Sequence, residues 1–454
     1  MKKSLYILIV VFLVAVISGC DDSEDTSEQD SISGYSVRIG GIFPFSGALS
    51  EPAKQFHHSA LLAKKHLEEA GYPIGWAVAN SETNRFTGVK VARELIEEGK
   101  AQVLIASYAS SVTIRIATEV SIPLRVPQIS YGSTSPELTM LPEDEGQDLL
   151  FRTSSPDSLQ GSVLAKLAMD EGYTQVAVLC ADNLYGRSIK DVFVEQFRAR
   201  GGEVNNIVIH PIRPDYLSGE ILIGGDYTAE LQLAAQGGVT TLVALSYLGH
   251  ANDYVKQADA HGFKNFLFVD GTKSLRLIDT VGAEKLEGMC GTAPASKPSE
   301  SLNIFEQAYL DEYGKADYNI MKIFPFMSNT YDAVIIAGLA AYAAQAMGEE
   351  VTSYTIRNYI RSVAGQDRDG DGQIDGEKVK TGSKELKRAM KILDSGRTIN
   401  YEGASGRLDF DQYGDVITPI EIWCYKNGQI ISRDLCEIND LNHIPFADIT
   451  CQPK

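Results

Sequence analysis

Two hydroxyl-rich tracts follow short apolar runs and are the first candidates for chemistry. The tract SYASSVT at 107–113 comes directly after VLIA, and ISYGSTSPELT at 129–139 follows another short apolar segment in the same way. A loop that leaves a parallel strand and opens a helix presents free backbone N–H groups and the positive end of the helix dipole. Serine and threonine hydroxyls would complete such a cradle for an anion, for example a carboxylate.

The same hydroxyls could instead serve as helix caps. Ser110 or Ser111 could cap the helix that follows the first tract, and Ser135 before Pro136 fits an N-cap followed by the first helical residue. We favour binding for Ser110 and capping for Ser135.

Catalysis by one of these serines is a remote alternative. A serine hydrolase of the α/β type needs a G-x-S-x-G turn, which the sequence lacks. The seven histidines show neither the HExxH motif nor another metal-ligand spacing, which disfavours a zinc hydrolase. We therefore predict that the chain is not an enzyme.

Length and charge limit the remaining functions. A chain of 454 residues with 44% hydrophobic content is long enough for two or three domains with large cores. The formal net charge of −19 argues against nucleic acid as a partner, because phosphate binding needs clustered lysine and arginine.

The order of the predicted elements indicates parallel sheets. From Val37 onward, short apolar strands alternate with amphipathic helices, the pattern of βα units. We expect four strands in a first sheet, and a helix from about Ala53 to Ala70 that stops at Gly71. After a loop near 141–149 the alternation starts again and predicts a second α/β lobe. The nearly apolar segment 330–348 is interpreted as a buried helix.

The N-terminus MKKSLYILIVVFLVAVISGC has the features of a secretion signal. Two lysines precede an apolar core from Leu5 to Ile17, which is shorter than the ~20 residues that span a bilayer. The segment from Ile17 to Cys20 resembles the bacterial lipobox, which implies cleavage before Cys20 and its acylation. Acyl chains would hold the protein on the membrane, outside the cytoplasm. Asp21 resembles the signal that retains lipoproteins on an inner membrane.

The cysteines after processing are odd in number, so at least one must lack a partner within the chain. Cys180, Cys290 and Cys424 lie in apolar strand-like runs, where we expect buried thiols. Cys436 and Cys451 flank a polar terminal segment, and a disulfide between them would close it.

The whole of 34–430 resembles bacterial extracellular solute-binding proteins of the leucine/isoleucine/valine type. The similar segments are IGGIFPFSGALS, ASYASSVT, PQISYGSTSPELT, FRTSSPDSLQG, LCADNLYG and INYEGASGRLDFDQYGD. The resemblance implies an α/β architecture, the type I periplasmic-binding fold, with two Rossmann-like lobes joined by hinge crossovers. The expected domains are a signal peptide at 1–19, an acidic disordered tether at 20–34, lobe 1 at 35–150 plus about 297–400, and lobe 2 at 151–296 plus about 401–454.

The resemblance implies that the two hydroxyl-rich tracts bind the α-carboxylate of a ligand. Ser110, the backbone of Gly132, and Thr134 would hold it, with Thr113 nearby. Pro52 and Ala53 depart from the residues that the family often has in its first loop, which implies a different side-chain pocket.

The second lobe would supply the ammonium site. Tyr185, Tyr247 and Asp270 fall at the matching strand ends, and a carboxylate with aromatic faces suits a cation. Ordinary packing of the tyrosines and capping by Asp270 remain open alternatives.

The segment DRDGDGQIDGEK at 367–378 resembles the start of an EF-hand calcium loop. Asp367, Asp369, Asp371 and the Gln373 carbonyl would be ligands of a structural calcium ion, but Lys378 stands at the twelfth position, where glutamate is usual. An acidic, glycine-rich surface turn is the open alternative.

Together these features predict a monomeric, membrane-tethered receptor that closes on an amino acid or a related small polar solute. Its expected partner is an ABC permease, and no cofactor is required. A sensory receptor of the same fold is the alternative.

Overall fold

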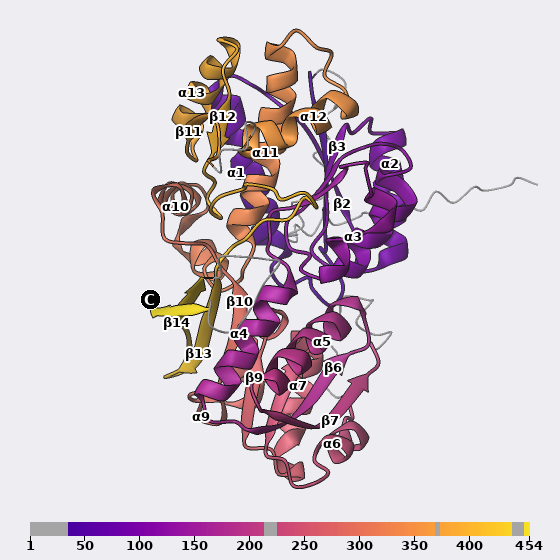
Figure 1. Ribbon diagram of the computed structural model, residues 1–454, viewed down its shortest axis with the longest axis vertical. Helices are drawn as coiled ribbons and strands as arrows, with labels where there is room; N and C mark the ends of the chain where they lie inside the picture. The colour runs from indigo at the N-terminus through magenta and orange to yellow at the C-terminus, as the bar shows by residue number, and fades with distance from the viewer. Residues whose placement is uncertain (1–34, 213–224, 368–372, 438–448) are drawn as a thin grey trace, which may run out of the picture.

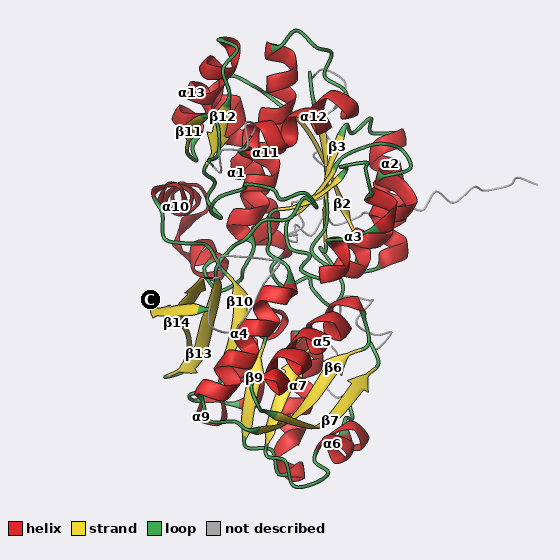
Figure 2. Ribbon diagram, in the orientation of Figure 1, coloured by secondary structure: helices red, strands yellow, loops and turns green. Residues whose placement is uncertain are grey.

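The computed structural model describes residues 35–212, 225–367, 373–437 and 449–454. It is elongated, with one β-sheet toward each end, and helices flank both sheets (Figure 1; Figure 2). We call the part built on the sheet of β1 to β5 lobe 1, and the part built on the sheet of β6 to β10 lobe 2. This arrangement is the predicted α/β fold with two parallel-core lobes.

Lobe 1 contains five parallel strands in the order β2-β1-β3-β4-β5, one more than the sequence predicts. The missed strand, β5, is only three residues long and ends in an arginine, so it shows no periodicity. The elements are β1 Arg38–Phe43, α1 Ala53–Ala70, β2 Gly75–Asn80, α2 Arg85–Glu97, β3 Val103–Ile105, α3 Ser110–Ile116, β4 Gln128–Ser130, β5 Leu150–Arg152, α10 Glu300–Met321, α11 Met327–Ala346, α12 Ser353–Ala364, β11 Glu377–Val379, α13 Ser383–Asp394 and β12 Ile399–Tyr401.

Lobe 2 contains a larger sheet in the order β15-β14-β13-β10-β9-β8-β6-β7. The neighbouring strands β7, β6, β8, β9 and β10 are parallel. The C-terminal strands β13, β14 and β15 extend the sheet beyond β10 in antiparallel pairing. The elements are α4 Asp157–Asp170, β6 Gln175–Ala181, α5 Leu184–Ala199, β7 Glu203–His210, α6 Thr228–Ala234, β8 Thr241–Leu245, α7 Leu248–Gln257, β9 Asn265–Phe268, α8 Arg276–Val281, α9 Ala283–Leu286, β10 Cys290–Pro294, β13 Ile420–Lys426, β14 Gln429–Glu437 and β15 Thr450–Pro453.

Helix α11 is the predicted buried helix, and it packs against α1 in lobe 1. Its one charged residue, Asp332, is fully buried. The Asp332 carboxylate accepts hydrogen bonds from the backbone N–H groups of Ala404 (2.9 Å) and Ser405 (2.7 Å) and from the hydroxyls of Tyr401 (2.8 Å) and Ser405 (2.6 Å). Burial raises the pKa of Asp332 to about 6, against the opposing effect of these donors.

The segment 402–418 packs against lobe 1, although we expected lobe 2 to resume at about 401. Besides the bonds to α11, the Phe410 ring packs on Phe151 with ring centroids 5.2 Å apart. The chain then passes to lobe 2, and the hydroxyls of Ser155 and Thr418 meet at 2.7 Å where two of the connections between the lobes run together. These connections are therefore hydrogen-bonded to each other.

Two disulfides reinforce the C-terminal side of lobe 2. Cys436 and Cys451, the pair expected from the sequence, are bonded. The prediction of buried thiols at Cys290 and Cys424 is wrong, because these two cysteines lie opposite each other on the antiparallel strands β10 and β13 and form a disulfide. Cys180 is a buried thiol, and burial raises its pKa to about 11.

The predicted signal peptide, the acidic tether and Cys20 lie outside the described residues, as do Asp369 and Asp371 of the predicted calcium loop. Among the described helices, none combines the length and apolar character needed to cross a membrane.

We expect the substitution Asp332→Ala to lower the free energy of unfolding by roughly 3 kcal/mol or more, because it leaves several buried donors unpaired. Asp394→Ala is the control, since Asp394 accepts one bond from Tyr342 at the surface and its loss should cost less than about 1 kcal/mol. Chemical denaturation of both variants measures the difference, and equal losses would contradict the role given to Asp332.

Candidate functional site

The two hydroxyl tracts lie side by side at the end of the lobe 1 sheet where strands β3 and β4 finish. Strands β3 and β4 are parallel neighbours, so the loops that follow them leave in the same direction. The loops are also bonded to each other, because the Ser130 hydroxyl donates to the Ser107 carbonyl (2.9 Å) and the hydroxyls of Thr113 and Ser133 meet at 2.7 Å. The predicted cradle is therefore a single hydrogen-bonded unit.

A buried arginine at the end of β5 fixes the second loop. Arg152 binds the Asp415 carboxylate through two nitrogens, Nε to Oδ1 at 2.5 Å and Nη2 to Oδ2 at 2.7 Å, and both side chains are almost fully buried. Its Nη1 donates to the Ser135 carbonyl at 2.9 Å. Such a planar, two-pronged contact holds the loop in one orientation.

Three of the four predicted lobe 1 residues line an inner pocket between the lobes. Ser110, Gly132 and Thr134 do so, and a Cβ at Gly132 would come 2.7 Å from the Tyr108 ring. The Ser110 hydroxyl accepts from the backbone N–H of Ser135 (3.2 Å), and the residue at the N-cap of α3 is Ala109. The capping alternative for Ser110 is therefore wrong.

Capping by Ser135 is confirmed, because its hydroxyl accepts from the Glu137 N–H (3.3 Å) at the start of a short 3₁₀ turn with Pro136 at the first position. Thr113 is placed differently from the prediction. Its hydroxyl is engaged with Ser107 and Ser133, and it lines neither pocket described in this section. Thr113 thus supports the loop instead of facing the cleft.

The three predicted lobe 2 residues line the opposite wall of the inner pocket. The Tyr185 hydroxyl donates to Asp270 Oδ1 at 2.6 Å, and the rings of Tyr185 and Tyr247 stack with centroids 5.4 Å apart. Asn183 caps α5 and donates to the Tyr247 hydroxyl at 2.8 Å. Gln160 Nε2 also donates to Asp270 Oδ1, at 2.8 Å.

A second buried carboxylate, which sequence reasoning missed, belongs to Asp157, which lines neither pocket described in this section but is near enough to Asp270 for that charge to raise its pKa. Asp157 is the first residue of α4, it is fully buried, and its N–H donates to the Thr134 carbonyl at 2.6 Å. Neither of its carboxylate oxygens accepts a hydrogen bond of normal geometry from a described residue, although the Thr134 hydroxyl is near. An aspartate after proline at a helix start is so common that no sequence signal marks it as a binding residue.

The electrostatics of the two carboxylates follow from burial. Burial raises the pKa of Asp157 well above its ordinary value, and the negative charge of Asp270 raises it further, while Thr134 and Arg152 act in the opposite direction. Burial also raises the pKa of Asp270, against the bonds from Tyr185 and Gln160. An isolated carboxylate in such a place is unfavourable unless a cation joins it.

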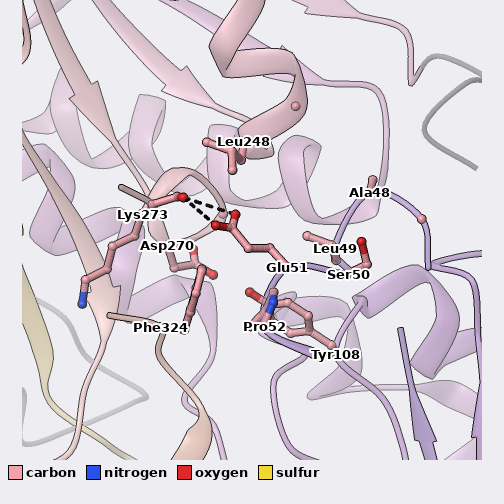
Figure 3. A pocket seen from close by; sticks show the side chains of 14 residues that line it. Ala48, Leu49, Ser50, Glu51, Pro52, Tyr108, Leu248, Asp270, Lys273 and Phe324 are labelled. Atoms are coloured by element: carbon pink, nitrogen blue, oxygen red, sulfur yellow. Dashed lines mark hydrogen bonds between the residues drawn. The ribbon is translucent and has the colours of Figure 1, made fainter. Parts of the chain in front are cut away.

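An outer pocket continues from the inner one and shares four residues with it: Leu49, Tyr108, Asp270 and Gly271. Figure 3 shows its lining, which includes the apolar side chains of Leu49, Pro52, Leu248 and Phe324. Ala53, the other expected departure in the first loop, starts α1 and does not line this pocket. The space between the atoms, with open solvent included, is about 260 Å³ at the inner pocket and about 560 Å³ at the outer one.

Residues 57–428 match the protein family described as the receptor family ligand-binding region. The chain belongs to this family. Its members bind ligands, and the matched region contains every inner-pocket residue named above except Leu49.

Several relatives share this fold. A chemotactic signal transduction system substrate-binding protein of Halobacterium salinarum is 23% identical over 421 residues, which cover 88% of this chain and 90% of that protein. A leucine-binding protein of Thermotoga maritima superposes with a TM-score of 0.67 at 21% identity, covering 88% and 98% of the two chains. A solute-binding protein from R. palustris in complex with benzoate superposes with a TM-score of 0.63 at 15% identity, covering 88% of this chain and 96% of that chain. Because the ligands named for these proteins range from leucine to benzoate, the ligand of this chain has to be inferred from its own site.

The lining of the two pockets bears on the hydrolase alternative. Among the described residues that line them, none is a histidine, and the Ser110 hydroxyl is bonded to a backbone N–H. The geometry thus offers no support for the hydrolase alternative.

We expect Asp157→Asn to stabilise the ligand-free protein at pH 7 by about 1 kcal/mol or more, because it removes a buried carboxyl group whose ionised form is disfavoured by burial and by the charge of Asp270. The raised pKa of Asp157 means that the folded state binds its proton more tightly than the unfolded state does, so wild-type stability should fall as pH rises through the raised pKa. This fall should be smaller in the variant. Denaturation curves at several pH values measure it, with the exposed Asp191→Asn as control, and a variant less stable than wild type at pH 7 would contradict the account.

Proposed function

We propose that this chain is an extracytoplasmic binding protein whose lobes close on an α-amino acid or a close analogue with a primary amine and a carboxylate. The observation that carries the proposal is a pair of buried carboxylates: Asp270, which lines the inner pocket, and Asp157, whose oxygens accept no hydrogen bond of normal geometry from a described residue. A ligand cation would satisfy both.

A primary ammonium fits this corner better than other ligand groups. It carries N–H donors that can point at the Asp157 oxygens and at Asp270, and the ring faces of Tyr185 and Tyr247 can lie beside its charge. A quaternary ammonium has no N–H to donate. A benzoate-like acid without an amine would bring a further negative charge to two carboxylates and leave Asp157 unpaired.

The carboxylate of the ligand would bind on the lobe 1 side. The hydroxyls of Ser110 and Thr134 and the backbone of Gly132 face the same inner pocket from the opposite wall. A zwitterion carries opposite charges at a short separation, so it can satisfy both walls only when the lobes are together. This complementarity would make ligand binding and lobe closure one event.

The wider role that we propose is delivery of the ligand to an ABC permease by a protein tethered to the membrane through an acylated Cys20. The resemblance to leucine-type binding proteins and the likeness in fold support transport, whereas the chemotactic relative supports sensing as the second candidate. Genes for a permease and an ATPase beside this one would favour transport, and a transducer gene would favour sensing.

We expect the two walls to recognise different groups of the ligand. Asp270→Asn and Asp157→Asn should each weaken binding of an amino acid roughly ten- to one-hundred-fold, because hydrogen bonds to charged groups are worth about 1.5 to 3 kcal/mol. They should not weaken binding of the des-amino analogue, which lacks the ammonium and is repelled by the carboxylates. Ser110→Ala should weaken both compounds. Calorimetry with leucine and 4-methylpentanoate, or with the best amino acid from a thermal-shift screen and its des-amino form, measures these ratios.

The control is Asp191→Asn, an exposed change on α5 that should alter neither affinity. If both aspartate variants lose as much affinity for the des-amino compound as for the amino acid, the proposed ammonium site is wrong, and so is the assignment of an amino acid as ligand.

A further inference from the structure

Glu51 lines the outer pocket from lobe 1 and contacts lobe 2. Its two carboxylate oxygens accept from the Ser274 hydroxyl at 3.0 and 3.2 Å, which Figure 3 marks with dashed lines. Arg276 Nε lies 3.3 Å from Oε1, on a side chain that is half exposed. Glu51 therefore belongs both to the wall of the pocket and to the contact between the lobes.

The loop that carries Glu51 is held in place. Gly47 has a φ of +93°, and a Cβ there would come 2.2 Å from the Glu82 carbonyl oxygen, so only glycine fits this turn. The Thr83 hydroxyl accepts from the Leu49 N–H at 3.2 Å and donates to the Ser46 carbonyl at 3.3 Å. The carboxylate is thus presented from a fixed position.

Among the described residues that line the outer pocket, no positive side chain is free to pair with a ligand anion. Lys273 lines it, but its ammonium is bound to Glu421, and both groups are buried. Figure 3 shows the Lys273 side chain pointing away from Glu51. Arg276 is already paired with Glu51. Burial raises the pKa of Glu51, against Arg276 and Ser274, as expected for a carboxylate that faces a water-poor space.

We propose that Glu51 determines which ligand side chains the closed cleft accepts, an inference that rests on the proposed function. With its amine and carboxylate in the inner pocket, an amino acid would extend its side chain past Leu49 and Tyr108 into the outer pocket. An apolar side chain, or one with an N–H or O–H donor, meets apolar surface and a carboxylate that can accept another bond. A side chain that ends in a carboxylate meets a like charge, and the cation beside it, Arg276, is already paired with Glu51.

The test compares amino acids that differ only in the distal group. Affinities of L-glutamine and L-glutamate, and of L-asparagine and L-aspartate, are measured by calorimetry on three proteins. Wild type should bind the better-bound amide at least tenfold more tightly than its acid. Glu51→Gln keeps the shape and the bond to Ser274 while it removes the charge, so the preference should fall at least tenfold with binding of the amide retained.

Ser274→Ala is the matched control, because it removes the bond between the lobes but leaves the charge of Glu51. It should weaken both members of a pair to a similar extent and keep the preference. The inference is overturned if wild type binds the acid as tightly as the amide, if it binds neither member of either pair, or if Glu51→Gln keeps the wild-type preference.

These outcomes are separable from the failure of the proposed function. If leucine or another amino acid binds and depends on Asp270, while the amide and acid pairs show no effect of Glu51, only the role of Glu51 fails. If no amino acid binds at all, the proposed function fails, and the inference fails with it.

Discussion

The burial of two carboxylates, Asp157 and Asp270, is the main physical constraint on what the cleft can bind. Removing one such group from water is costly, and placing a second beside it adds repulsion. Tyr185 and Gln160 offset part of this cost at Asp270 through hydrogen bonds, whereas at Asp157 only the nearby Thr134 hydroxyl and the charge of Arg152 act against it, without a hydrogen bond of normal geometry. Proteins retain such costly groups at functional sites, where a ligand supplies what the fold leaves out. The buried carboxylates thus lower the stability of the cleft without ligand, and a ligand amine would remove this cost by pairing with them.

The position of Asp157 links this constraint to the mechanics of the molecule. The residue stands where the chain enters lobe 2, and its N–H is bonded to the carbonyl of Thr134 in the lobe 1 cradle. Arg152, a few residues before it, holds the same loop and pairs with Asp415 on another segment that leads to lobe 2. A shift of the lobes would therefore act directly on the geometry of the ligand site, which is the coupling that a receptor needs.

Much of this could be predicted from the sequence, and the failures have physical causes. The alternation of strands and helices predicts two parallel sheets, because each strand run and each amphipathic helix is a local pattern. Ser110 and Thr134 could be proposed because their loops follow strands of one sheet, and Asp270 because the family resemblance places it at the matching strand end of the second lobe. Asp157 could not, since an aspartate at a helix start usually only interacts with the helix dipole. The disulfide between Cys290 and Cys424 depends on the pairing of strands distant in sequence, which local composition does not encode.

The most direct test of the central claim is to identify the small molecule that the natively purified protein retains. The protein is isolated without denaturation, the ligand is released by unfolding, and its mass and fragmentation are determined. The account predicts a compound with both a primary amine and a carboxylate, and with no second carboxylate at the end of its side chain. A retained acid without an amine, such as a benzoate, would contradict the claim that the buried carboxylates select the ligand.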